Sequence, residues 1–189
     1  MTTEERINSF LELCEKIHFT PTGDFQNWLV NNRFFTAPAS TKYHGAYEGG
    51  LFDHSLAVTK RLMKLSVNNK LDWQRKESPF IIGMFHDLCK CDQYVLTVDE
   101  NAYNMLTGTP GEINYKYNEN TLLKGHGSKS VMLLSQFITL TEEEMLCIRY
   151  HMGAYEKEEW AEFDAAIKKY ETVFWTHAAD MLASKVDGI

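Results

Sequence analysis

A run of ten residues, FIIGMFHDLC at positions 80–89, constrains the fold more than any other part of this 189-residue chain. The run is apolar almost without interruption, so a helix formed by it has no polar face to turn toward water. Such a helix has to lie at the centre of a protein, with other elements packed around it. His86 and Asp87 interrupt the run, and a buried polar or charged side chain is costly unless it is paired. The chain therefore needs a sizeable core and strong partners for these two side chains.

Apolar residues recur at helical spacing on both sides of this run and predict a helical bundle. A capping segment at Thr3–Arg6 opens the first helix, and a capping box at Thr141–Glu144 opens a later one. The expected helices cover about residues 3–18, 24–35, 51–67, 78–89, 126–138, 142–152, 158–169 and 171–186. A chain of 189 residues suits one domain, so we expect these helices to share a single core over residues 1–189.

Residues 93–117 depart from the helical pattern. Tyr94–Val98 and Ile113–Tyr117 are rich in β-branched and aromatic residues, and a Thr-Gly-Thr-Pro-Gly turn lies between them. We therefore expect a small β-hairpin excursion near residues 93–117. The predicted fold class is all-α with this hairpin added.

Charge and composition narrow the classes of function. The formal net charge is −7 and the basic residues are scattered, which disfavours a long nucleic acid and favours a small substrate. The segment MTTEERINSF lacks the features of a signal peptide, and no stretch approaches the roughly 20 apolar residues that cross a bilayer. The four cysteines are too irregularly spaced for a disulfide framework or a paired zinc motif. We expect a cytoplasmic protein with no membrane partner, in which reduced cysteines serve packing.

Further polar residues stand out against their surroundings. Asp180 lies in an otherwise apolar helix, His54 follows a Gly-Gly pair, His126 lies between two glycines, and His151 comes at a helix end. Each of these alone is more often a structural or surface residue. The His-Asp pair of the apolar run could equally be hydrogen-bonded within a core. As a set, however, these residues offer the imidazole and carboxylate ligands that divalent metals bind.

In chain order these residues read H, HD, H, H and D, and the sequence around them resembles the HD superfamily of metal-dependent phosphohydrolases. The matching words are YHGAYEGGLFDHSLAV around His54, HDLCK at His86–Lys90, KGHGSKS around His126, YH at Tyr150–His151, and HAADMLASK around Asp180. The resemblance covers about residues 40–186 and leaves residues 1–35 as N-terminal helices. It implies the helical bundle of an HD domain.

The resemblance also implies a binuclear metal centre. The family's ligands of the first ion correspond to His54, His86, Asp87 and Asp180. His126 and His151 match the extra histidines of the two-metal branch, in which the aspartate of the HD pair, here Asp87, bridges the ions. A mixed site of this kind accepts Mn, Fe, Ni, Co, Zn or Mg. We expect two divalent ions.

Asp87 and Lys90 are the expected catalytic residues. Lys90 matches the lysine of the family's HDxGK word, and its ammonium could neutralise charge on phosphate oxygens. Cys89 replaces the usual glycine of that word. Substrate contacts are expected from Lys90 and from His44, Lys124, Lys129 and Arg149. His177 lies one helical turn before Asp180 and could orient a ligand from outside, although it could equally be an ordinary core histidine.

The words around His54 and Asp180 are most similar to those of bacterial 3′-to-5′ exoribonucleases, which carry an N-terminal nucleic-acid-binding barrel. Two short predicted helices precede the motif here instead. We therefore expect a metal-activated hydroxide to cleave a phosphoester of a nucleotide or short oligonucleotide, as a phosphomonoesterase or phosphodiesterase. The alternatives are an HD-type di-iron oxygenase, a 3′-to-5′ exonuclease on single-stranded nucleic acid, and a non-catalytic module that metals stabilise. The oligomeric state stays open.

Overall fold

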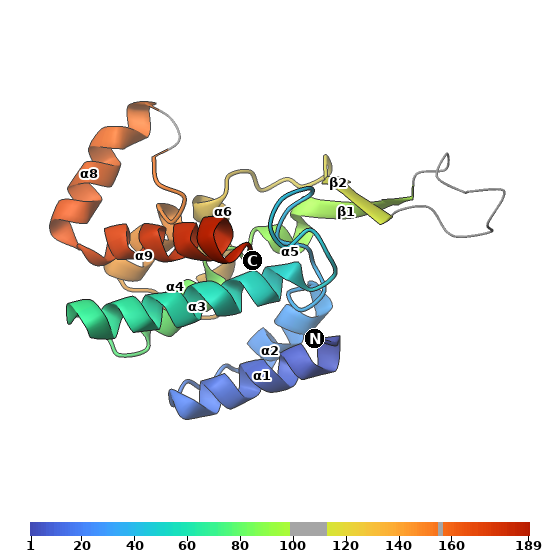
Figure 1. The fold of residues 1–189 in the computed structure, drawn as a ribbon, viewed down its shortest axis with the longest axis horizontal. Coiled ribbons are helices and arrows are strands. Elements are labelled where there is room, and N and C mark those ends of the chain that lie inside the picture. The colour runs from blue at the N-terminus through green and yellow to red at the C-terminus, as the bar shows by residue number, and fades with distance from the viewer. Residues whose placement is uncertain (99–112, 155–156) are drawn as a thin grey trace.

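The computed structural model describes residues 1–98, 113–154 and 157–189 and is mostly helical (Figure 1). The α-helices are α1 (Thr3–Lys16), α2 (Gly23–Asn31), α3 (Gly50–Asn69), α4 (Ser78–Phe85), α5 (Lys90–Gln93), α6 (Gly127–Leu134), α7 (Glu142–Arg149), α8 (Trp160–Lys169) and α9 (Thr172–Met181). A 3₁₀ turn (η2, Lys157–Glu159) precedes α8, and a π-helix (η3, Leu182–Asp187) follows α9. The prediction of a mostly helical fold is confirmed.

The apolar run lies at the centre of the bundle. Every residue from Ser78 to Cys91 is buried, and α4 packs along α3. Gly83 makes this packing close, because a Cβ at that position would lie 2.6 Å from the Cα of Thr59 in α3. The burial predicted from the sequence is therefore confirmed.

Helix α4 is shorter than the apolar run that contains it. It ends at Phe85, and α5 begins at Lys90 after a turn. In this turn the Lys90 N–H donates to the Asp87 carbonyl at 2.9 Å, three residues back. The N–H of Cys89 donates to Ser130 Oγ at 3.1 Å, so a distant segment takes the place of a helical acceptor. The expected single helix over 78–89 is thus divided, and this turn carries the His-Asp pair.

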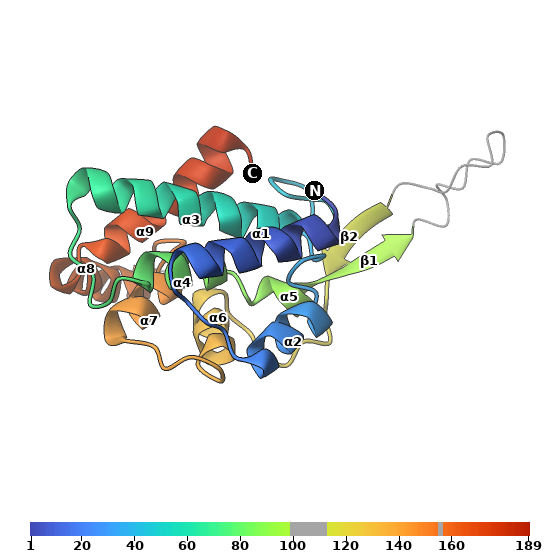
Figure 2. The ribbon, with the colours of Figure 1, turned by 90° about the horizontal axis from the view of Figure 1, so that it is seen from below.

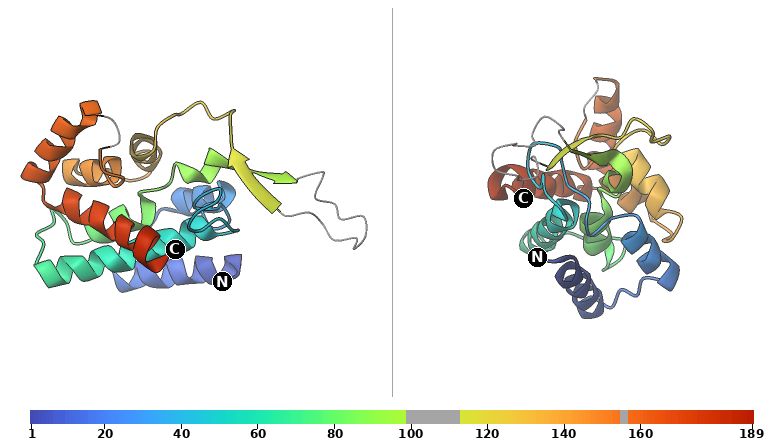
Figure 3. Two further views of the ribbon diagram at one scale, coloured as in Figure 1. Left: turned by 45° about the horizontal axis from the view of Figure 1, so that its top comes forward. Right: turned by 90° about the vertical axis from the view of Figure 1, so that its right-hand side faces the viewer.

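Helix α3 lies between α1 and α9 (Figures 1 and 3). The buried guanidinium of Arg6 in α1 donates two hydrogen bonds of 3.0 and 2.9 Å to the carboxylate of Asp53 in α3. Bidentate pairs of this kind fix orientation as well as adding energy. The buried phenylalanines of the core come from α1, α2, α3, α4 and the loop after α2, namely Phe10, Phe25, Phe34, Phe35, Phe52, Phe80 and Phe85. The N-terminal helices therefore share the core that surrounds α4.

Two antiparallel strands form the predicted hairpin. They are β1 (Tyr94–Val98) and β2 (Ile113–Tyr117), with Tyr94 opposite Tyr117. Figure 2 shows the two strands projecting from one end of the helical bundle. The strands are confirmed, while the expected Thr-Gly-Thr-Pro-Gly turn lies outside the described residues.

Several helices end before the apolar spacing suggests. Helix α6 ends at Leu134 and α7 at Arg149, and the segment expected as one helix over 171–186 is divided into α9 and η3. Both parts of this segment pack against α3. Within residues 1–98, 113–154 and 157–189, none of the helices has the length and apolar character needed to cross a bilayer.

Candidate metal centre

Six side chains that are far apart in the chain converge beside the turn after α4. They are His54 of α3, His86 and Asp87 of the turn, His126 at the start of α6, His151 just after α7, and Asp180 of α9. Each has a ring nitrogen or carboxylate oxygen 3.4 Å or less from that of another member. All except His126 are at most 5% exposed. The structure therefore brings together every residue that the sequence suggested as a metal ligand.

The packing of α6 against α7 explains how His126 reaches the cluster. Helix α6 begins at Gly127, where a Cβ would lie 2.2 Å from the Arg149 carbonyl oxygen at the end of α7. Glycine alone permits this approach, which places the His126 and His151 rings 5.3 Å apart. The sequence shows His126 between two glycines, and at Gly127 the reason is the close approach of the neighbouring helix.

Asp87 lies between two groups of imidazoles. Its Oδ2 is 3.6 Å from His54 Nε2 and 3.4 Å from His86 Nε2. Its Oδ1 is 2.9 Å from His126 Nε2 and 3.4 Å from His151 Nε2. We use the name first subsite for His54, His86, Asp180 and the Oδ2 side of Asp87, and second subsite for His126, His151 and the Oδ1 side of Asp87. One carboxylate thus faces both subsites.

The buried imidazoles direct their Nε2 atoms toward each other. The Nδ1 of His54 lies 2.9 Å from the main-chain oxygen of Ile189, and the Nδ1 of His86 lies 2.9 Å from the carbonyl of Gly83. A main-chain oxygen only accepts, so each Nδ1 carries a proton and donates it. The two Nε2 atoms are 3.3 Å apart, and His54 Nε2 also lies 3.1 Å from Asp180 Oδ1. An imidazole whose Nδ1 is held in this way can present its Nε2 to a metal ion.

The second subsite contains buried polar atoms without partners. Among the described residues, no hydrogen bond reaches Asp87 Oδ1, His126 Nε2 or His151 Nε2. The short distances between these atoms do not have hydrogen-bond geometry. Native structures leave few buried polar atoms unsatisfied, and a cluster of them calls for an explanation such as an ion. The chemistry and placement of these donors therefore fit a divalent cation.

Both aspartates of the cluster are carboxylates. Burial alone would raise the pKa of Asp87, but the charges of Lys90, His86 and His126 outweigh it and hold this pKa well below its usual value. Burial likewise opposes ionisation of Asp180, yet the hydrogen bond with His54 and the neighbouring imidazoles lower its pKa. Burial lowers the pKa of His86, which favours its neutral ring, whereas at His151 burial is outweighed by the neighbouring carboxylate of Asp87, which raises the pKa of His151. Neutral imidazoles and ionised carboxylates are the forms that bind metals, so metal binding would compete with protonation of His151.

Lys90 lies inside the cluster rather than on its surface. Its side chain is buried, and its ammonium is 2.6 Å from Asp87 Oδ2. Burial disfavours the charged amine, but the attraction of Asp87 is stronger and raises the pKa of Lys90. A buried ammonium therefore neighbours the first subsite. Its role in the reaction stays a prediction.

The structure places Cys89 beside the second subsite, whereas the sequence predicted that the cysteines serve only packing. The Sγ of Cys89, a carboxylate oxygen of Asp87 and a ring nitrogen of His126 all lie within 4.8 Å of one another. Among the described residues, this group and the group of His54, His86 and Asp87 are the sets of three side chains whose ligand atoms lie close enough together to hold a metal ion. Burial raises the pKa of the Cys89 thiol to about 12, so the free thiol keeps its proton. The sequence shows only that Cys89 lies two residues after Asp87, which does not fix the direction of its side chain.

Two further histidines adjoin the cluster. The half-buried ring of His44 lies 5.0 Å from that of His54. Burial, followed by the charges of His54 and Lys90, lowers the pKa of His44 to about 4. The Nδ1 of His177 donates to the main-chain carbonyl of His151 at 2.8 Å. His177 therefore holds the backbone of His151, a candidate ligand, rather than a side chain of the cluster.

The remaining basic residues suggested as phosphate contacts have different surroundings. Lys129 is buried, and its ammonium is held by Asp92 at 2.5 Å and by Thr121 at 2.8 Å. Arg149 is exposed and donates to Ser128 Oγ at 2.7 Å. Lys124 is exposed in the segment between β2 and α6. Lys129 is therefore paired within the protein and is not free to contact phosphate, whereas Lys124 and Arg149 are accessible from solvent.

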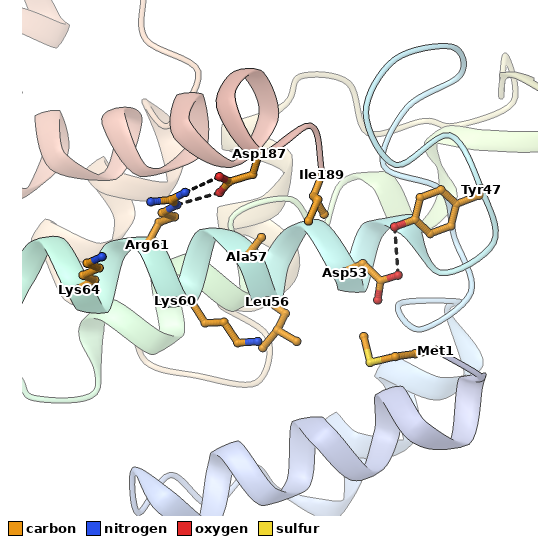
Figure 4. A pocket seen from close by; sticks show the side chains of 10 residues that line it. All are labelled: Met1, Tyr47, Asp53, Leu56, Ala57, Lys60, Arg61, Lys64, Asp187 and Ile189. Atoms are coloured by element: carbon orange, nitrogen blue, oxygen red, sulfur yellow. Dashed lines mark hydrogen bonds and ion pairs between the residues drawn. The ribbon is translucent and has the colours of Figure 1, made fainter.

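A groove of about 500 Å³ runs along the face of α3 that carries Asp53, Ala57 and Lys60 (Figure 4). It meets the cluster at Ile189, whose main-chain oxygen accepts the hydrogen bond from His54 Nδ1. The side chains of the cluster itself are closed to solvent except at His126, which is 29% exposed. A substrate that reaches the cluster therefore has its most open approach at His126.

Comparison of the chain with protein-family models, curated proteins and solved structures finds no match. Function is therefore inferred from the chemistry of the cluster and from the resemblance of the surrounding sequence motifs to those of the HD superfamily. Four imidazoles, two carboxylates and one ammonium share a mostly buried site. Such a site can bind divalent cations and hold an anionic group beside them.

Proposed function

We propose that this chain is an HD-type metal-dependent phosphohydrolase that cleaves a phosphoester of a nucleotide or short oligonucleotide. The observation that carries the proposal is the position of Asp87. Its two oxygens face different pairs of imidazoles, and Oδ1 has no hydrogen-bond partner in the part of the chain that the structure describes. A carboxylate placed in this way suits two cations better than it suits a core hydrogen-bond network.

The ligands would divide between two ions. His54, His86 and Asp180 would hold the first ion with Asp87, and His126 and His151 would hold the second ion with the same aspartate. When bound, divalent ions supply Lewis acidity toward phosphate oxygens and make water nucleophilic near neutral pH. The main-chain acceptors of Nδ1 keep the Nε2 atoms of His54, His86 and His151 directed into the cluster.

Lys90 would stabilise negative charge on the phosphoryl group. Its ammonium is buried, so its attraction for an oxyanion is screened less than that of a surface lysine. It also holds Asp87 ionised through the 2.6 Å contact. His44 is neutral near pH 7, because its pKa is lowered to about 4, and it can donate a hydrogen bond to a substrate oxygen.

The exposure of the cluster favours a small substrate or the end of a chain. The buried ligands leave His126 as the member most accessible to solvent, and the whole chain carries a net charge of −7. A long polyanion gains affinity by contacts with many basic residues. Nucleotides, cyclic nucleotides and short oligonucleotides carry few phosphates. They can be bound by the cluster and the few basic side chains beside it.

The test is hydrolysis by the purified protein with Mn²⁺, assayed for phosphate or nucleoside release from nucleotides, cyclic nucleotides and short RNA. We expect turnover that a chelator abolishes. Asp87→Asn should remove it while circular dichroism stays unchanged, and Asp164→Asn, an exposed change in α8, should not. Oxygen consumption with an iron absorption band and no phosphate release would instead indicate the di-iron oxygenase. Metal binding without turnover of any of these substrates would indicate a non-catalytic module.

A further inference from the structure

We infer that Cys89 supplies a sulfur ligand to the second subsite and makes that subsite select a thiophilic ion such as Zn²⁺ or Co²⁺ over Mg²⁺. This inference rests on the two-ion centre of the proposed function. It adds a ligand that neither the HDxGK word nor the six His and Asp residues contain. It also predicts that the two subsites differ in the metals they bind.

The geometry of the second subsite carries the inference. The Sγ of Cys89 and ligand atoms of Asp87 and His126 lie within 4.8 Å of one another. Ligands about 2.0–2.3 Å from a tetrahedral zinc ion are about 3.3–3.8 Å from each other. Small side-chain adjustments would therefore let the three atoms close on one ion. His151 Nε2, which is 3.4 Å from Asp87 Oδ1, is available as a fourth ligand.

A second, independent observation is that buried polar atoms of the second subsite lack hydrogen-bond partners among the described residues. Asp87 Oδ1 and His126 Nε2 make no hydrogen bond with any described residue, and Asp87 is 1% exposed. Cys89 is 0% exposed, and its main-chain N–H is held by Ser130 Oγ at 3.1 Å. The thiol is thus fixed beside unsatisfied ligand atoms rather than among apolar side chains alone.

The chemistry of a thiolate sets the preference. Coordination replaces the S–H bond by a metal–sulfur bond, and the proton leaves to solvent. Thiolate is a soft ligand that favours zinc and related ions, while magnesium takes oxygen ligands. The first subsite offers only imidazole and carboxylate ligands. It therefore also accepts harder ions such as Mn²⁺ or Mg²⁺. A protein loaded with two different metals is the expected outcome.

The experiment is a titration of the metal-free protein with Co²⁺, followed by ultraviolet and visible absorption. Coordinated thiolate gives a sulfur-to-cobalt charge-transfer band that imidazole and carboxylate ligands do not give. We expect this band in the wild-type protein and its absence in Cys89→Ser. Removing even a partner of a metal ligand lowers affinity about 10–100-fold, so we expect the affinity for the second Co²⁺ to fall at least about 10-fold. A 100-fold excess of Mg²⁺ should leave the band in place.

Cys91→Ser is the matched control, because Cys91 is also buried and lies two residues further along the chain. It should keep the band. Cys89→Gly restores the HDxGK word, and it should lack the band even if Cys89→Ser is poorly folded. The folding of all three variants is checked by circular dichroism.

Persistence of the band with unchanged cobalt affinity in Cys89→Ser would overturn the inference. Cobalt binding by the wild-type protein without a sulfur band would also overturn it. Phosphate release with Mn²⁺ is measured in parallel and separates the two claims. Turnover without a sulfur band leaves the proposed function standing alone. A sulfur band without turnover of any substrate supports the ligand assignment and counts against the phosphohydrolase.

Discussion

Among the described residues, buried carboxylates occur in two regions, and their surroundings differ. At the start of α7, Glu144 is 0% exposed, and each of its oxygens accepts two hydrogen bonds, from Arg75, Ser78 and the N–H of Thr141. At the cluster, Asp87 is 1% exposed, and its Oδ1 accepts no hydrogen bond from the described residues. Burial of charge is common to both regions. The unsatisfied oxygen makes the surroundings of Asp87 a candidate binding site, whereas Glu144 is a fully hydrogen-bonded structural residue.

A charged residue of the cluster should matter for activity, whereas Glu144 should matter for folding. We expect Asp180→Asn to lower kcat/KM for the best nucleotide substrate at least about 1,000-fold, or about 4 kcal/mol of transition-state stabilisation. The physical reason is the loss of a carboxylate that lies 3.1 Å from His54 Nε2 and that would bind the first ion. Steady-state phosphate release measures the effect.

The control for this prediction is Glu144→Gln, assayed at a temperature where it is folded. Its kcat/KM should stay within about 3-fold of the wild-type value, since Glu144 lies outside the cluster. An equal loss of activity in the two variants would show that buried carboxylates support activity only through folding.

For the free energy of unfolding we expect the opposite order, with a larger loss in Glu144→Gln than in Asp180→Asn. Glu144→Gln should lower the free energy of unfolding by about 3 kcal/mol, because it leaves Arg75 without its carboxylate and removes acceptors from a buried site. Urea unfolding monitored by circular dichroism measures this change. In metal-free protein Asp180→Asn should cost less, since it removes a negative charge from a site that lacks its cation. A larger loss in Asp180→Asn would contradict the division between the two regions.

Metal addition sharpens the same comparison. At a Mn²⁺ concentration about 100 times its Kd, binding to the native state adds about 2.7 kcal/mol to the free energy of unfolding. We expect this gain in the wild-type protein and in Glu144→Gln, since the cluster is intact in both. Asp180→Asn should show a much smaller gain. Thermal unfolding with and without Mn²⁺ provides the measurement, and the same gain in all three proteins would place the ion elsewhere.

The sequence predicted the cluster better than it predicted the details of the fold. His86, Asp87 and Asp180 stood out because polar residues in apolar helices need partners, and that argument depends only on local sequence. The position of Cys89 could not be found in this way, because its orientation depends on the bond from its N–H to Ser130. The commitment of Lys129 to Asp92 is likewise a contact between distant segments.

The same distinction applies to the helices. The capping box at Thr141 was readable from four consecutive residues and is present, with Glu144 bonding back to the Thr141 N–H. The break after Phe85 was not readable, because apolar character continues through the turn to Leu88. Local hydrogen bonds can be predicted from local sequence, whereas the end of a buried helix depends on the elements packed around it.

The smallest expected effect concerns His44, which lies next to the cluster and is only half-buried. Burial lowers its pKa in the folded protein to about 4, whereas an unfolded histidine has a pKa of about 6.5. Between these values the unfolded chain binds more protons than the native state, so this residue makes stability rise with pH from about 4 to about 6.5. Partial exposure limits the contribution to about 1 kcal/mol. His44→Gln should therefore flatten the stability profile of metal-free protein in this window, as measured by urea unfolding at several pH values.

His18→Asn, a change at an exposed residue with a φ of 59°, should leave the profile unchanged. An unaltered slope in His44→Gln would mean that burial does not lower the pKa of His44 in the folded protein.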